Sequence, residues 1–130
     1  MSIEFKWLAY TVLLTALLWV PYVLNRMVVR GVWGTLQNPV PDEPALAAWA
    51  LRAKAAHNNA VINLAIFAPL VLMLGVTGES TGLSVLACQL YFWARLLHYL
   101  VYAMGIPVAR TLTFVAGWAA QLMLLWVLLG

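Results

Sequence analysis

The stretch that decides the fold is Tyr91–Arg110, YFWARLLHYLVYAMGIPVAR, which is apolar enough to lie in a membrane yet carries charged and polar side chains. An α-helix turns by about 100° per residue, which places Tyr91, Arg95, His98 and Tyr102 within roughly 60° of one another. An arginine inside a bilayer costs on the order of 2.5 kcal/mol or more, so it normally faces protein or water. This stripe predicts a membrane helix whose polar face is turned towards a bundle interior and marks a functional site.

The composition of the chain favours an integral membrane protein. The chain has 130 residues, of which 65% are hydrophobic and 8% are charged, whereas a soluble domain is about 25% charged. A chain of this length leaves no room for several domains. The net charge of +3 includes Arg52, Arg95 and Arg110, which lie in or beside apolar segments, so we expect no nucleic-acid partner. Cys88 is the only cysteine, which excludes an internal disulfide, and no metal-ligand spacing is present.

Four apolar segments, each near the ~20 residues that span a bilayer, predict an all-α integral membrane four-helix bundle that forms a single domain over residues 1–130. The four helices are expected at about residues 3–29, 45–74, 81–104 and 108–129. Pro21 predicts a bend in the first helix. The second helix has a polar first half and an apolar second half. We therefore expect it to begin outside the hydrocarbon, on the side of Arg52.

Basic residues predict the orientation of the bundle, because short cytoplasmic loops carry an excess of Lys and Arg. The first and third connections lie on the same side of the membrane, and they hold or adjoin Arg26, Arg30, Arg52, Lys54 and Arg110. The opposite side has one basic residue at the start of the chain. We therefore place these two connections in the cytoplasm and both termini outside it.

The geometry of the α-helix predicts that the polar residues of two helices lie at a similar depth in the membrane. Arg52, Asn59 and Asn63 share a stripe roughly 40° wide on the second helix. Arg52 is expected ~12 Å and Arg95 ~15 Å from the cytoplasmic ends of their helices, at about 1.5 Å per residue, and Arg110 opens the fourth helix on that side. The sequence therefore predicts a polar pocket in the cytoplasmic half of the membrane.

The predicted pocket has arginines and no acid. All four acidic residues lie near segment ends, and guanidinium groups without carboxylates favour an anionic guest. The alternative is that these arginines bond backbone carbonyls or lipid phosphates. Arg26 and Arg30 are interpreted as topology anchors. His57 lies about 140° from Arg52 around its helix, so we expect it to bridge to a neighbouring helix.

Two blocks of the sequence resemble the MAPEG family, the membrane-associated proteins of eicosanoid and glutathione metabolism. They are RAKAAHNNAVINLAIFAPLVL, which begins at Arg52, and ARLLHYLVYAMGIPVAR, which ends at Arg110. The chain looks like a bacterial-type member, similar to microsomal prostaglandin E synthase and the microsomal glutathione transferases. The resemblance implies a homotrimer in the bacterial inner membrane, with glutathione bound between neighbouring protomers on the cytoplasmic side.

The resemblance also implies roles for individual residues. Arg110 matches the arginine proposed to stabilise the glutathione thiolate, and a nearby cation does lower the pKa of a thiol. Arg95, His98 and Tyr102 match positions that line the glutathione site on the third helix, and Asn59 matches the asparagine of the second-helix motif. We add Arg52 and Asn63 to the predicted binding residues because they share the stripe of Asn59.

The second-helix motif departs from the family at Ile62, where the family usually has a glutamate that contacts glutathione. Ala55 and Asn58 also stand where many members carry arginine. Two hypotheses therefore remain open. The first is a glutathione-dependent transferase or peroxidase that acts on lipophilic electrophiles dissolved in the membrane. The second is a non-catalytic membrane protein that binds lipid or accompanies a larger membrane complex.

Assembly is predicted from the second helix as well. Asn59 and Asn63 would be costly if they faced lipid, and a neighbouring copy can satisfy them. Ala53, Ala56 and Ala60 would allow close approach of that copy. We therefore expect homotrimer contacts on this helix, with membrane lipids as the other partners.

Overall fold

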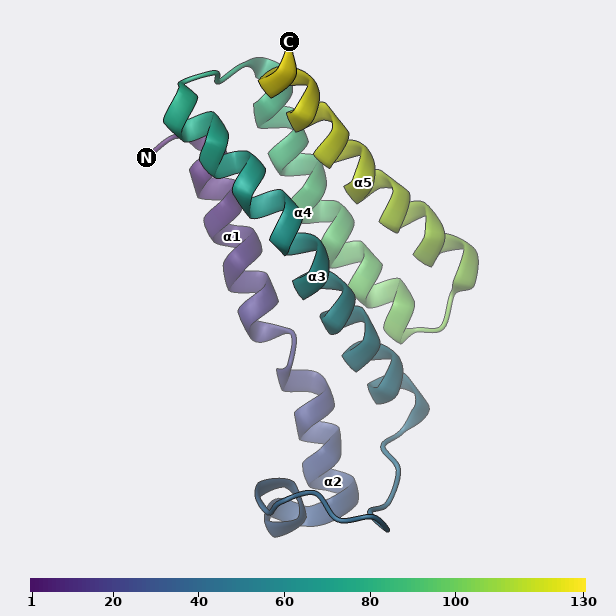
Figure 1. Cartoon of the computed structure of the whole chain (residues 1–130). Helices are drawn as coiled ribbons and strands as arrows, with labels where there is room; N and C mark the ends of the chain where they lie inside the picture. The colour runs from purple at the N-terminus through teal and green to yellow at the C-terminus, as the bar shows by residue number, and fades with distance from the viewer.

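The computed structural model describes residues 1–130 and contains helices and no strands (Figure 1). The helices are α1 (Ile3–Leu17), α2 (Val20–Leu36), α3 (Ala48–Thr77), α4 (Gly82–Ala103) and α5 (Pro107–Leu129). α1 and α2 together form the first arm, and α3, α4 and α5 form the other three. Both termini and the α3–α4 connection lie at one end of the bundle, whereas the α2–α3 connection and the α4–α5 turn lie towards the other (Figure 1). The prediction of an all-α four-helix bundle is confirmed.

Three stretches of helix are long and apolar enough to cross a membrane: Ile3–Leu36, Ala48–Thr77 and Pro107–Leu129. α4 is not among them, because its polar stripe lowers its hydropathy. α4 nevertheless packs against α5, α3 and α1, so it crosses the membrane as the fourth member of the same bundle. The chain is therefore an integral membrane protein.

The first arm is interrupted at residues 18–19, between α1 and α2. Pro21 accounts for the interruption, because proline has no N–H to bond the carbonyl four residues earlier. The hydroxyl of Tyr99 on α4 donates to the Leu18 carbonyl over 3.0 Å, and this bond is buried. The predicted bend is therefore present, and α4 supplies a polar partner for the backbone at the break.

His57 on α3 bridges the two halves of the first arm, as predicted. Its Nε2 lies 3.0 Å from the Thr15 carbonyl of α1, and its Nδ1 lies 2.8 Å from the Tyr22 hydroxyl of α2. A carbonyl only accepts, so Nε2 carries the proton and Nδ1 accepts from the tyrosine. The ring thus holds both sides of the break in a fixed relation to α3.

α3 begins at Ala48, three residues later than about residue 45 as predicted. The backbone N–H of Ala47, the residue before the helix, donates to Asn25 Oδ1 of α2 over 3.0 Å. This bond ties the start of α3 to α2, and Ala47 itself is not helical, with φ −55° and ψ 150°. Arg52 is therefore nearer to the end of its helix than expected.

Arg30 is more than the topology anchor predicted from the sequence. Its guanidinium pairs with Glu43 over 2.7 Å and donates through Nε to the Pro44 carbonyl over 2.8 Å. Directly after it, Gly31 takes a positive φ of 73° and turns the last part of α2 aside. The end of α2 and the connection to α3 are therefore fastened to each other.

The interior of the bundle corrects one interpretation of the sequence. Ala53, Ala56 and Ala60, expected to face a neighbouring copy, are buried within the chain at 1%, 0% and 4% exposure. They form a core cluster with Leu18 and Tyr99, from the break in the first arm and from α4. Small residues on one helix face have the same sequence signature whether the close neighbour belongs to the same chain or to another copy. These alanines therefore carry no argument for a trimer.

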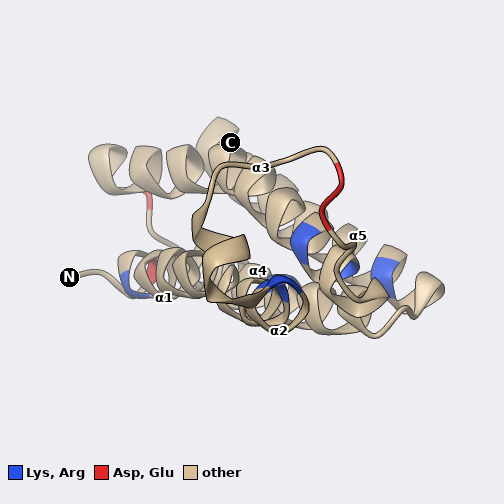
Figure 2. Ribbon diagram, turned by 90° about the horizontal axis from the view of Figure 1, so that it is seen from below, with Lys and Arg blue, Asp and Glu red and all other residues tan.

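A second core cluster fills the other end of the bundle and joins α3, α4 and α5. Its two rings, Phe67 and Tyr91, stack with centroids 3.8 Å apart and planes at 7°. Figure 2 shows Lys and Arg on α2, α3 and α5, and the helix bounds place Arg30, Arg52 and Arg110 towards the α2–α3 connection and the α4–α5 turn. The apolar cluster therefore lies at one end of the bundle and the cations gather at the other.

Candidate functional site

The α4 stripe predicted from the sequence faces the interior of the bundle. Tyr91, Arg95 and His98 are 1%, 3% and 2% exposed, and Tyr102 is half-buried. Gly117 on α5 lies opposite, and a Cβ there would come within 3.6 Å of Arg95 Cδ and 3.9 Å of Tyr91 Cδ2. These are ordinary van der Waals distances, so α5 packs directly over the stripe and encloses it.

Arg95 belongs to a polar chain that links three helices. Its Nη2 donates to Asn59 Oδ1 over 2.6 Å, and Asn63 Nδ2 donates to the Asn59 carbonyl and side-chain oxygens over 2.9 and 3.3 Å. Gln121 on α5 completes the chain by donating to the Asn63 carbonyl over 3.3 Å. Asn59 and Asn63 are thus bonded within one chain, so their polarity does not by itself require a neighbouring copy.

Four of the predicted site residues surround one cavity of about 270 Å³, towards the end of the bundle that holds the α4–α5 turn. The lining residues are Asn59 from α3, His98 and Tyr102 from α4, and Arg110, Thr111 and Phe114 from α5. The His98 ring packs edge-on against Tyr102, with centroids 5.5 Å apart. Its Nδ1 is buried without a hydrogen-bond partner. A buried polar atom without a partner beside a cavity is suited to bind a polar ligand group there.

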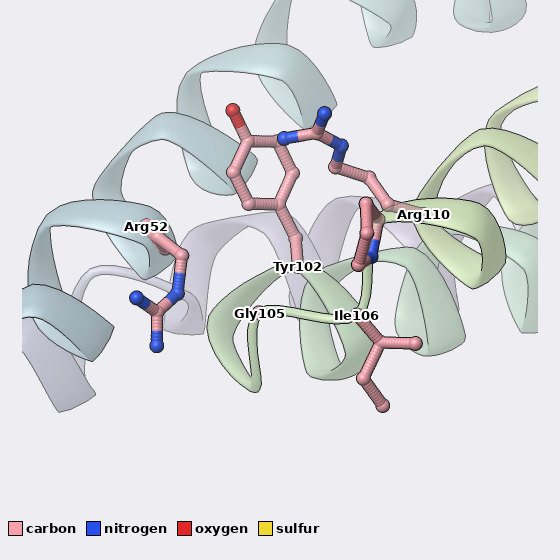
Figure 3. A pocket seen from close by; sticks show the side chains of 6 residues that line it. Arg52, Tyr102, Gly105, Ile106 and Arg110 are labelled. Atoms are coloured by element: carbon pink, nitrogen blue, oxygen red, sulfur yellow. The ribbon is translucent and has the colours of Figure 1, made fainter.

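A second cavity, of about 140 Å³, adjoins the first at the turn between α4 and α5 (Figure 3). Arg52 lies on one side of Tyr102, and the Arg110 side chain extends over the Tyr102 ring (Figure 3). The Arg110 guanidinium carbon is 4.7 Å from the centre of that ring, a cation–π distance. Gly105 and Ile106 complete the wall with Pro107, the first residue of α5. Because Tyr102 and Arg110 line both cavities, the two form one continuous cationic region.

The structure thus divides the predicted site residues into two groups. Asn59, His98, Tyr102 and Arg110 line the larger cavity and Arg52 lines the smaller one. The other two, Arg95 and Asn63, line neither cavity and act through the polar chain that fixes Asn59.

Sequence reasoning missed three neighbours of this region. Phe114 follows Arg110 by four positions, which is the helical spacing that places two side chains on the same face, whereas Thr111 follows Arg110 by only one position. Gln121 is the only amide side chain in α5, and a lone polar residue in an apolar helix is a sign of an interior partner. Phe114 and Gln121 therefore had a signal in the sequence, and Thr111 had none.

The arginine side chains of the two cavities fit the anionic groups of glutathione but not its ammonium group. The guanidiniums of Arg52 and Arg110 face the cavities, and guanidinium suits carboxylate and thiolate acceptors. Neither cavity is lined by an acidic residue, and the single ion pair of the chain joins Arg30 to Glu43 in the α2–α3 connection. The anionic groups of the peptide are therefore matched and its ammonium is not.

These features define a helical membrane protein with a cationic cavity between α3, α4 and α5. The chain belongs to the MAPEG family, whose family model matches residues 7–130. It is therefore a membrane protein of the eicosanoid and glutathione metabolism type. Comparisons with curated proteins and with solved structures find no match.

Proposed function

We propose that the chain is a glutathione-dependent transferase or peroxidase that acts on lipophilic electrophiles dissolved in the bilayer. The observation that carries the proposal is the convergence of Arg110, His98, Tyr102 and Asn59 on one cavity of about 270 Å³. A membrane protein with a cationic cavity that opens among apolar helices can bring an anionic thiol and an apolar electrophile together. Family membership supports the same chemistry.

In this proposal the residues have distinct tasks. Glutathione, when bound, supplies the thiol nucleophile. Arg110 lowers the free energy of the thiolate, because an adjacent cation favours the charged form, and the start of α5 adds the positive end of a helix dipole. His98 donates or accepts through its free Nδ1, and Asn59, held by Arg95 over 2.6 Å, presents a fixed amide.

The assembly and the orientation belong to the same proposal. The protein forms a homotrimer in the bacterial inner membrane, with the α2–α3 connection and the α4–α5 turn in the cytoplasm and both termini outside. The support is the gathering of basic segments at that end (Figure 2) and the broad apolar surface of the single chain. Ile62, at 67% exposure, lies one helical turn after Asn59 on α3, where a second copy would complete the cavity wall.

A specific observation also favours a second candidate, a non-catalytic membrane protein that binds lipid or accompanies a larger complex. Ile62 stands where the family usually has a glutamate, and no other acid lines the cavities. A chain that keeps the fold and loses a ligand contact can serve as a scaffold. Absence of any glutathione binding would favour this candidate.

Titration of the purified protein with glutathione, followed by the ultraviolet absorbance of the thiolate, tests the proposal. The parent protein should raise the thiolate fraction near neutral pH, and Arg110→Ala should lower that fraction about tenfold, which corresponds to a pKa change of about one unit. Arg110 is exposed in the first turn of α5, so the fold should tolerate this change.

Two control variants keep this result interpretable. Arg110→Lys keeps the charge and should retain part of the thiolate signal, whereas Lys54→Ala removes an exposed charge outside both cavities and should change nothing. Equal thiolate signals for the parent protein and Arg110→Ala would refute thiol activation by Arg110.

A further inference from the structure

We infer that the cationic region selects its thiol peptide by the carboxylates and does not bind the ammonium, so that a thiol peptide with a blocked amino group is bound as well as glutathione or better. This inference rests on the proposed function and specifies the ligand groups that the site recognises. It is carried by the free donors of two arginines and by the positions of the four acids.

Arg52 presents free donors to the smaller cavity. Its Nε donates to the Ala103 carbonyl at the end of α4 over 3.1 Å, and the two terminal nitrogens make no hydrogen bond within the chain. Gly105 has a positive φ of 78°, and a Cβ there would lie 3.3 Å from the Arg52 guanidinium carbon. The glycine therefore lets the side chain lie flat across the turn, with its outer fork free for a carboxylate.

Arg110 presents the second set of donors. Its guanidinium makes no hydrogen bond within the chain and is held only by the Tyr102 ring, at 4.7 Å from the centroid. Arg52 and Arg110 lie on opposite sides of Tyr102 (Figure 3), so the region offers two separate guanidiniums. Two separate anionic groups on one ligand match this arrangement.

The four acids leave the ammonium without a partner in the chain. Glu43 is paired with Arg30 over 2.7 Å. Glu4 and Glu79 lie at the other end of the bundle, in the first turn of α1 and in the α3–α4 connection. Asp42 lies in the α2–α3 connection and lines a different cavity. An ammonium near Arg52 and Arg110 would therefore meet like charges, and its removal would strengthen the attraction between the ligand and the site.

Binding of three peptides to the full chain in detergent tests the inference, with dissociation constants measured by calorimetry. N-acetyl-glutathione should bind at least as tightly as glutathione. Glutathione dimethyl ester, which keeps the ammonium and loses both carboxylates, should bind about tenfold or more weakly, because it loses charge-assisted hydrogen bonds. Arg52→Gln should weaken the first two peptides by a similar factor, and Lys54→Gln, which removes an equal charge outside both cavities, should not.

Ile62→Glu supplies the positive control, because it adds an acid one helical turn from Asn59. In this variant glutathione should gain about tenfold in affinity through a charge-assisted bond to its ammonium, whereas N-acetyl-glutathione should gain nothing. The variant therefore reverses the preference between the two peptides.

If N-acetylation of glutathione weakens its binding to the parent protein about tenfold, the inference is overturned. In that case Asp42→Asn shows whether Asp42 of a neighbouring copy binds the ammonium. If N-acetyl-glutathione binds but no thiolate forms with glutathione, the proposed function fails and the inference stands. If no peptide binds, both are overturned.

Discussion

Replacement of Asn59 by alanine should destabilise the bundle, because Asn59 is the only side chain that bonds the buried guanidinium of Arg95. The bond from Arg95 to Asn59 Oδ1 measures 2.6 Å, and Arg95 is 3% exposed. A hydrogen bond to a charged group contributes about 1.5–3 kcal/mol, whereas polar bonds in a membrane bundle average ~0.6 kcal/mol and reach ~1.7 kcal/mol. We therefore expect Asn59→Ala to lower the free energy of unfolding by about 2 kcal/mol, measured by reversible unfolding in mixed micelles.

Asn58→Ala is the matched control for this change. Asn58 is the neighbouring residue, is exposed, and makes no side-chain hydrogen bond within the chain, so its loss should change stability by no more than about 0.5 kcal/mol. Both variants exchange the same pair of residue types, so their helix propensities cancel. In the background of Arg95→Met, Asn59→Ala should cost little, because no guanidinium is left unbonded. Equal stability of the Asn58 and Asn59 variants would refute the role given to this bond.

Two further changes test how the helices of the bundle are held together. Gly75→Ala should displace the Phe5 ring of α1, because its Cβ would run into the far end of that ring. The free energy of unfolding should fall by about 1 kcal/mol relative to Gly82→Ala, where a Cβ meets nothing. Equal stability of the two variants would contradict this packing. Tyr22→Phe should cost about 1 kcal/mol by removing the 2.8 Å bond to His57, with faster amide hydrogen exchange around the break in the first arm. Unchanged exchange there would show that this bond does not hold the break.

The fold could be predicted from the sequence because its main signals are periodic and local. The length of the apolar segments predicts the four arms, and Pro21 predicts the break at residues 18–19. The 100° turn per residue predicts that Tyr91, Arg95 and His98 share one face, and all three are buried together. These signals need no knowledge of which helix lies beside which.

Features that depend on the neighbour of a helix could not be predicted in the same way. The partner of the Ala47 N–H before α3 is Asn25 on another helix, and the partner of Arg30 is an acid in the following connection. Gln121 can bond the Asn63 carbonyl only because of the relative position of α5 and α3 along their axes. Register depends on the packing of complementary side-chain shapes, which periodicity does not contain.

The low hydropathy of α4 has a consequence for the order in which the protein enters the membrane. α4 carries Arg95 in its second half, and an arginine at a helix centre adds about 2.5–3.5 kcal/mol to the free energy of insertion by the translocon. The largest share of its packing is with α5, which the ribosome makes later. We therefore expect α4 and α5 to enter the membrane together, as one hairpin about the turn at Gly105. A chain that ends at Met104 lacks the helix on which α4 packs most, so we expect a premature stop there to impair two helices of the bundle at once.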